Sequence, residues 1–248
     1  MSNDKVRLFI GTSANGEDAL AEMTYEYTIR KNTDREVEIV WMRQTNDQSS
    51  FWYGFNDTMW STPFSGFRWA IPEYCNFEGR AIYTDVDMLN FCDIGELFDI
   101  EFESDDQLMY ARNGNRFGGK EFCVIVFDCS KFKFVQSKDV WKKNPEAHHQ
   151  FIHYFITKNN ALGGTLIGDL DPAWNSHDGD IDNPKILHYT KMATQPWRPA
   201  WYKGPIEDHP KQDLVNLFWK LAEDAEDSGY NLKDYSIDRG VTYNCIGK

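Results

Sequence analysis

The sequence predicts an α/β protein whose central sheet is mostly parallel and flanked by helices. Strand-like and helix-like segments alternate along the 248 residues, and the early strand-like runs end in acidic or small polar residues. Strands joined by helical crossovers pair in parallel. No internal repeat and no linker rich in Gly, Ser and Pro divides the chain. We therefore expect a single domain over residues 1–248, in which residues 203–248 form a C-terminal helical extension.

The first half of the chain opens with a strand, a helix and a second strand. Residues 5–10 are partly apolar and precede a small polar segment, as a first strand feeding a loop does. Residues 17–31 carry apolar side chains at near-helical spacing, and residues 36–42 alternate as a strand does. Residues 79–84 are a compact β-prone run that ends at the acidic tripeptide 85–87.

The second half repeats this theme. Residues 123–128 are β-branched and aromatic, which predicts a strand, and residues 148–158 have the spacing of an amphipathic helix. A late strand over 185–190 and a charged helix over 211–227 follow. Residues 99–120 show weak periodicity, so we expect a mobile loop or an insertion there.

Composition excludes several classes of function. The chain has 26 Lys and Arg against 39 Asp and Glu, a net charge of −13. No basic patch is visible, so we expect neither nucleic-acid binding nor stable membrane association. The five cysteines show no Cys-x-x-Cys spacing, and no apolar run approaches the roughly 18 residues of a membrane span. We expect a cytoplasmic protein with reduced thiols, and its oligomeric state stays open.

Two carboxylates follow the third predicted strand. Asp85 and Asp87 are separated by one residue at a strand end, the edge at which open parallel sheets bind ligands. Two carboxylates at one point repel each other unless a hard cation lies between them, which predicts Mg²⁺ or Mn²⁺. Solvated turn acids are the alternative interpretation of this spacing.

A histidine ends the late strand. An imidazole at His188 completes a set of oxygen and nitrogen ligands for Mn²⁺, which accepts imidazole more readily than Mg²⁺ does. A structural histidine is the alternative.

Two other metal patterns are rejected. His149 and His153 have the i, i+4 spacing of a zinc protease but have Gln150 where its base must be Glu, and the acidic run 169–180 does not fit a calcium hand.

Several motifs occur in a fixed order over about residues 5–202. They are Phe9-Ile10-Gly11-Thr12-Ser13, Phe67-Arg68-Trp69-Ala70-Ile71-Pro72, Ala81 to Leu89 with Asp93 to Phe98, Leu170-Asp171-Pro172-Ala173-Trp174-Asn175, and His188-Tyr189-Thr190 with Pro196-Trp197. In this order they resemble the family 8 glycosyltransferases, the group that includes glycogenin and bacterial lipo-oligosaccharide galactosyltransferases.

The resemblance implies a GT-A type nucleotide-sugar-binding fold, a UDP-sugar donor, a divalent metal that is usually Mn²⁺ (or Mg²⁺), and transfer with retention at the anomeric carbon. Asp85, Asp87 and His188 would bind the metal, and Asp87 and Gln150 would act at the reacting sugar. The remaining donor-binding residues that it implies are Ile10, Gly11, Thr12, Ser13, Arg68, Val86 and Lys191.

Three positions depart from the family pattern. His149 stands where an Asp usually precedes the glutamine, Glu121-Phe122-Cys123 replaces Asn-Ala-Gly, and Gln195 replaces the lysine that touches the diphosphate, a charge that Lys191 or Lys203 would supply. These changes leave open a catalytically silent module that binds a nucleotide-sugar or a glycan. A third class is a metal phosphoesterase or nucleotidyltransferase. The sequence names neither the sugar nor the acceptor, for which a saccharide and a protein are equally open.

Overall fold

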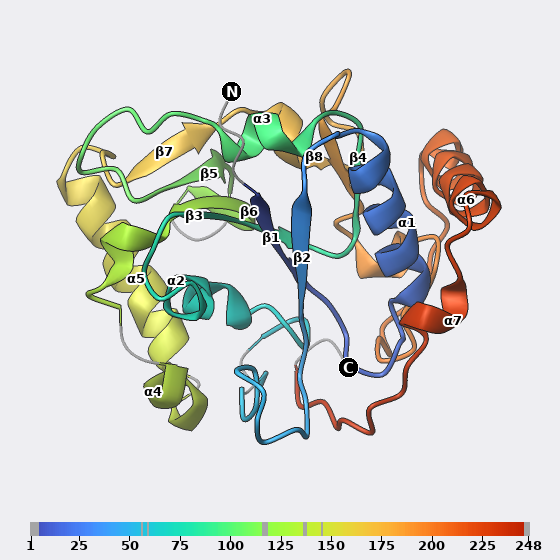
Figure 1. The fold of residues 1–248 in the computed structure, drawn as a ribbon, viewed down its shortest axis with the longest axis horizontal. Coiled ribbons are helices and arrows are strands. Elements are labelled where there is room, and N and C mark those ends of the chain that lie inside the picture. Colours follow the sequence, from blue (N-terminus) through green and yellow to red (C-terminus); the bar gives the residue numbers. More distant parts are fainter. Residues whose placement is uncertain are drawn as a thin grey trace.

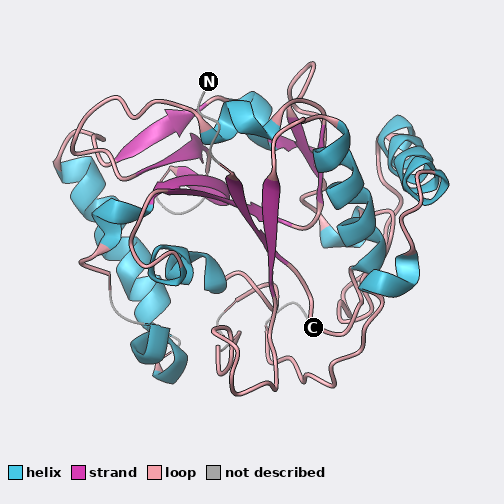
Figure 2. Ribbon diagram, viewed as in Figure 1, coloured by secondary structure: helices cyan, strands magenta, loops and turns pink. Residues whose placement is uncertain are grey.

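In a computed structural model we describe residues 5–55, 57–58, 60–115, 119–135, 138–144 and 146–245 (Figures 1 and 2). The central sheet has the order β2-β1-β3-β6-β5-β7, and its strands are β1 (Val6–Gly11), β2 (Val37–Met42), β3 (Arg80–Asp85), β5 (Met109–Asn113), β6 (Lys120–Asp128) and β7 (Ile167–Leu170). A smaller sheet has the order β4-β9-β8, with β4 (Met88–Asn90), β8 (Ser176–His177) and β9 (Ile186–His188).

The helices lie on both sides of the central sheet (Figure 1). They are α1 (Ala19–Lys31), α2 (Ile71–Tyr74), α3 (Ile94–Phe98), α4 (Lys138–Lys143), α5 (Glu146–Ala161), α6 (Gln212–Asp227) and α7 (Leu232–Tyr235), with short 3₁₀ turns at Phe67–Ala70, Cys129–Phe132, Pro172–Asn175 and Met192–Thr194. Within the described residues, no helix combines the length and the apolar character that crossing a membrane requires.

The central sheet is mostly parallel, as predicted. Strand β1 pairs in parallel with β2 and with β3, and β5 pairs in parallel with β7. Strand β6 runs antiparallel to both of its neighbours, β3 and β5. The carboxyl ends of β1 and β3 therefore lie side by side at one edge of the sheet, where Gly11 pairs with Asp85.

Alternate residues of the central strands face two separate cores. Leu8 and Ile10 of β1 pack with side chains of α1 and α3 on one face. Phe9 points to the other face and packs with side chains of α2 and α5. This alternation follows from the two-residue period of a strand, and it explains why the N-terminal strand–helix–strand unit was predicted with nearly the observed bounds.

The smaller sheet and helix α6 pack against the outer side of α1. Phe218 and Ala225 of α6 share a buried cluster with Met23 of α1 and with Leu187 of β9. Figure 1 shows α6 and α1 side by side at the right of the view. This packing holds β9, and with it His188, against the end of the central sheet.

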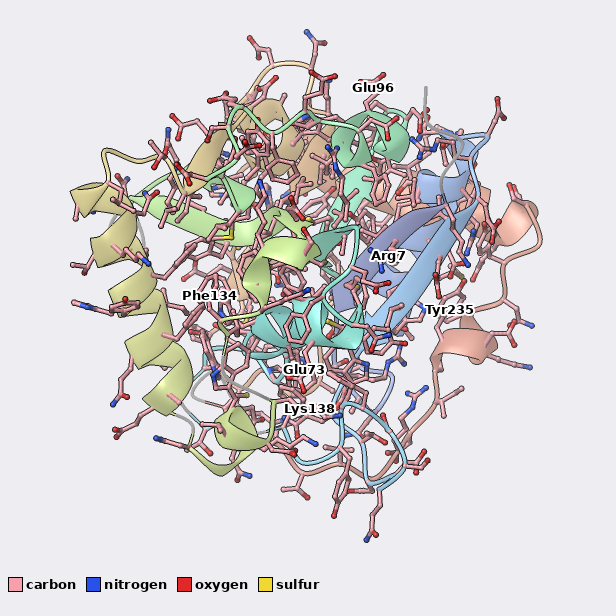
Figure 3. All side chains as sticks on the ribbon, turned by 60° about the vertical axis from the view of Figure 1, so that its left-hand side comes forward. Arg7, Glu73, Glu96, Phe134, Lys138 and Tyr235 are labelled. Carbon is pink, nitrogen blue, oxygen red and sulfur yellow. The ribbon has the colours of Figure 1, made fainter. Side chains whose placement is uncertain are left out.

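The helices on the opposite side are joined by local contacts. Figure 3 shows Glu73 of α2 next to Lys138 of α4, whose backbone amide donates a 2.7 Å hydrogen bond to the Glu73 carboxylate. The Lys138 ammonium also lies 3.6 Å from the centre of the Phe51 ring. These contacts fix the start of the segment that continues into α5.

The expectation of a loop or insertion over residues 99–120 is wrong for its second half. Strand β5 lies there, between β6 and β7. Met109 and Ala111 are fully buried, and Tyr110 between them is buried on the opposite face. A strand that is covered on both faces has no polar side to alternate with, so its sequence carries no two-residue pattern.

Residues 236–245 lie across the loop that follows β1, and they form neither helix nor strand (Figure 1, red). The Tyr243 hydroxyl accepts hydrogen bonds from the backbone amides of Ala14, at 2.6 Å, and Asn15, at 3.2 Å. It donates to the Glu17 carboxylate at 2.9 Å. We refer to residues 236–245 as the C-terminal strap.

Replacing Tyr243 by phenylalanine is expected to lower the free energy of unfolding by about 1–3 kcal/mol, because the Ala14 amide loses its acceptor and the Asn15 amide keeps only the Glu17 carboxylate. Urea unfolding measures this loss. Tyr53→Phe serves as the control, since Tyr53 is 38% exposed. Equal stabilities of the Tyr243 and Tyr53 variants would show that the strap does not satisfy these amides.

Candidate active site

A cavity of about 300 Å³ opens where β3 ends. Asp85, Asp87 and His188 line it, and so does Arg68. Trp60 and Trp69 form part of an aromatic wall. The volume is at the lower end of the range for ligand pockets, about 300–1,000 Å³, and the mixture of apolar wall and few charged groups is typical of such sites.

Backbone pairing brings the two carboxylates and the imidazole together. Asp85 is the last residue of β3, and Asp87 lies in the turn that leads into β4. In the smaller sheet Met88 pairs with His188, and the amide of Tyr189 donates to the carbonyl of Asp87 at 2.9 Å. One Asp87 carboxylate oxygen, Oδ1, consequently lies 3.1 Å from Nε2 of His188.

A hydrogen bond with Asn175 fixes the orientation of the His188 ring. Its Nδ1 lies 2.9 Å from the Oδ1 of Asn175, an amide oxygen that can only accept, so Nδ1 carries the hydrogen. In the neutral ring, Nε2 then presents a lone pair to Asp87 Oδ1, and this buried oxygen accepts no hydrogen bond from the described residues. Two acceptors 3.1 Å apart require a proton or a cation between them.

This donor set fits a divalent cation. Carboxylate oxygens with one imidazole nitrogen suit Mn²⁺ and related ions, and a metal-binding imidazole normally donates its other N–H to an oxygen such as that of Asn175. Asp85, Asp87 and His188 are therefore the residues that would hold the ion.

Both members of the Asp87–His188 pair have shifted pKa values. Burial raises the pKa of Asp87, and the neighbouring imidazole only partly opposes this. Burial acts to lower the pKa of His188, but Asp87 outweighs it and the net change is upward. Groups perturbed in this way by burial and a charged partner are concentrated at functional sites.

Asp85 is held by a buried arginine. Nη2 of Arg68 lies 3.3 Å from Oδ1 of Asp85, and Nη1 of Arg68 donates to the backbone carbonyl of Phe122. The Tyr83 hydroxyl donates to the same Asp85 oxygen, and the guanidinium lies over the Tyr83 ring, 4.4 Å from its centre. Arg68 was predicted to face the donor, and the structure places it in the cavity wall, in contact with the first carboxylate.

Gln195 orients the second carboxylate. Its Nε2 donates to Oδ2 of Asp87 at 2.8 Å and to the carbonyl of Tyr189 at 2.9 Å. Sequence reasoning treated Gln195 as the loss of a lysine and assigned no role to Gln195 or Asn175. Asn175 ends one of the motifs quoted above and Gln195 directly precedes another, Pro196-Trp197, and these positions were the available signal.

The structure does not bring the β1 segment into the cavity. Ile10, Gly11, Thr12 and Ser13 are buried, and they are not among the described residues that line the cavity. The Thr12 hydroxyl donates to Glu22 at 2.7 Å. The C-terminal strap covers the residues that follow. The predicted uridine-binding role of this segment therefore stays a prediction.

The other predicted residues are dispersed. Val86 is buried beneath the site, where its amide donates to the carbonyl of Gly11 at 3.0 Å. Lys191 and Gln150 are exposed and are also missing from the described lining residues. Helix α5 contributes Ile152 to the cavity lining, and its His149 ring stacks on the lining residue Trp60 with 4.5 Å between ring centres.

A buried carboxylate joins the β1 loop to the segment after β9. Oxygens of Asp18 accept hydrogen bonds from the indoles of Trp197, at 3.1 Å, and Trp201, at 3.4 Å. Burial raises the pKa of Asp18 to about 6; hydrogen bonds from Ser13 and Trp197 lower it, and Glu22 and Asp87 add to the rise. The ordinary value is 3.8, so the group favours folding below about pH 4, and this contribution disappears as the pH rises through about 6.

The stability conferred by Asp18, relative to an Asp18→Asn variant, is expected to fall by about 2.5 kcal/mol between about pH 4 and pH 7. Urea unfolding of both proteins across this range measures the difference, in which the carboxylates common to both cancel. Asp182→Asn, at an exposed position, is the control. A pH-independent difference for Asp18→Asn would contradict the prediction.

The sequence comparisons do not assign the chain to a family. No protein-family model matches the chain. Protein CDI of Arabidopsis thaliana is 24% identical over 221 residues, which cover 79% of this chain and 80% of that protein.

Several solved structures with similar folds are glycosyltransferases. The galactosyltransferase LgtC in complex with donor and acceptor sugar analogues has a TM-score of 0.61 at 13% identity and covers 88% of this chain and 96% of its own. GlyE of Streptococcus pneumoniae has a TM-score of 0.60 at 14% identity and covers 96% of this chain. The bifunctional glycosyltransferase WbbM has a TM-score of 0.57 at 12% identity and covers 90% of this chain. The chain spans 66% of GlyE and 50% of WbbM. The predicted GT-A type α/β fold is thereby confirmed.

Proposed function

We propose that the chain is a metal-dependent, retaining glycosyltransferase that transfers a sugar from a nucleotide-sugar, in the first place a UDP-sugar, to a saccharide or protein acceptor. The observation that carries the proposal is the convergence of Asp85, Asp87 and His188 at one cavity. The likeness in fold to LgtC, whose structure holds donor and acceptor sugar analogues, supports the substrate class.

Electrostatics favour a cation at this site. The chain carries a net charge of −13, and the cavity lining includes Glu121 besides the two aspartates. A nucleotide diphosphate is itself anionic, so Arg68 alone does not offset the repulsion from these carboxylates. A divalent cation held by Asp85 and Asp87 turns this repulsion into attraction.

Each ligand of the proposed site has a partner that orients it. Arg68 positions Asp85, Gln195 positions Asp87, and Asn175 positions His188. When bound, a divalent cation would stabilise the negative charge that develops on the departing diphosphate. Gln150 is exposed and is not among the described residues that line the cavity, so we assign it no role in the transfer.

The test is the release of UDP from UDP-glucose, UDP-galactose and their N-acetyl forms, with Mn²⁺ and with EDTA. We expect release from one or more donors with Mn²⁺, its loss in EDTA, and its recovery when Mn²⁺ is added back. Binding of every donor without turnover would instead indicate a silent binding module. UMP or sugar phosphate as the product would indicate a nucleotidyltransferase or phosphoesterase.

A further inference from the structure

A cysteine lies among the proposed metal-binding residues. Cys123 belongs to β6, and the antiparallel register that pairs Thr84 with Val124 places Cys123 opposite Asp85 when it is extended by one residue. Cys123 lines the same cavity as Asp85 and His188. Strand pairing, rather than a flexible loop, therefore positions this thiol.

The sulfur is close enough to share an ion with its neighbours. The ligand atoms of Asp85, Cys123 and His188 all lie within 4.8 Å of one another. The Asp87 carboxylate adds an oxygen 3.1 Å from the His188 nitrogen. The cluster thus offers two carboxylates, one imidazole and one thiol around one point.

We propose that Cys123 supplies a sulfur ligand to the cation site of Asp85, Asp87 and His188, and that this site prefers the thiophilic ions Zn²⁺, Co²⁺ and Cd²⁺ to Mg²⁺. Sulfur ligands select borderline and soft ions, whereas Mg²⁺ takes oxygen ligands almost exclusively. On coordination a metal–sulfur bond forms, and the thiol proton is released to solvent. The inference rests on the metal site of the proposed function, and it deepens that proposal by naming the class of ion.

The first test is titration of the metal-free protein with Co²⁺, followed by near-ultraviolet absorption. The wild type is expected to develop a sulfur-to-cobalt charge-transfer band, and Cys123→Ser is expected to lose it. Cys92→Ser is the matched control, because Cys92 is also half-buried but is directed at the carbonyl of Lys185. A band that persists in Cys123→Ser, or a wild type without a band, would overturn the inference.

Competition binding gives a second readout. Cys123→Ser is expected to bind Cd²⁺ at least about tenfold more weakly than the wild type, with unchanged affinity for Mg²⁺. Equal Cd²⁺ affinities would overturn the inference.

If Cys123→Ser does not fold, alkylation of the wild-type protein replaces the test with this variant. Cd²⁺ should slow modification of Cys123 at least about tenfold and leave Cys92 unaffected, as mass spectrometry of the labelled peptides can show. Equal alkylation of Cys123 with and without Cd²⁺ would likewise overturn the inference.

These outcomes separate the two proposals. Mn²⁺-dependent UDP release without a charge-transfer band would reject the sulfur ligand and leave the glycosyltransferase proposal standing. A band that depends on Cys123, without UDP release from any donor, would support the sulfur ligand and reject the transfer reaction. Failure of the wild type to bind Co²⁺ and Cd²⁺ would reject the thiophilic site.

Discussion

Asp87→Asn is expected to reduce Mn²⁺-dependent UDP release at least about hundredfold, because a neutral amide is a poor ligand for a hard cation and the site loses one of its two negative charges. Initial rates at saturating donor measure this loss. Mn²⁺ should also raise the melting temperature of the wild type but not that of the variant, since only a protein that binds the ion gains stability from it.

The control for Asp87→Asn is Asp182→Asn, which alters an exposed aspartate and should keep both the rate and the response to Mn²⁺. In EDTA the Asp87 variant should be at least as stable as the wild type, because it no longer buries a carboxyl whose pKa burial raises. An Asp87→Asn enzyme with a normal rate and a normal Mn²⁺ response would refute the proposed metal site.

Arg68→Met is expected to cost about 3–5 kcal/mol of folding free energy in EDTA, because it leaves the buried Asp85 carboxylate without its positively charged partner. Urea unfolding measures the loss. Added Mn²⁺ should recover more stability in this variant than in the wild type, since the bound ion then replaces the missing positive charge.

Two further variants test the cause. Arg30→Met removes a more exposed arginine that pairs with Glu26 one turn away, and it should cost less than about 1 kcal/mol. The double variant Arg68→Met/Asp85→Asn should be more stable than Arg68→Met alone, because no unpaired charge remains buried. A double variant no more stable than Arg68→Met would show that the ion pair is not the source of the loss.

The sequence predicted the parts of the fold whose signals are local. Strand β1, helix α1 and strand β3 carry periodic apolar patterns, and the aspartates at 85 and 87 follow directly from the end of β3. In the smaller sheet only β9 was predicted, as the late strand over 185–190. The three-residue strand β4 was not predicted, and neither was the pairing that joins Met88 to a residue 100 positions away. That pairing brings His188 to Asp87, so the site depends on a contact that only the structure shows.

In the loop that follows β1, the sequence identifies candidate side chains but not their hydrogen-bond partners. Thr12 and Ser13 have side chains suited to ligand binding, and the sequence resemblance implied that use. In the structure the Thr12 hydroxyl donates to the Glu22 carboxylate, and the Ser13 hydroxyl accepts from the backbone amide of Asp18. Propensity and motif order do not reveal which of two nearby partners a hydroxyl takes, because that choice depends on burial.

The C-terminal strap has a consequence for the order in which the chain is made. The amides of Ala14 and Asn15 leave the ribosome early, but the oxygen that they bond arrives with Tyr243, after every strand of both sheets. During translation this corner of the protein is open to water, and it closes only when nearly all of the described chain has emerged. A nascent chain arrested between residues 230 and 240 should therefore hold a formed sheet beside an uncovered loop, which a protease could cut and which the longer chain protects.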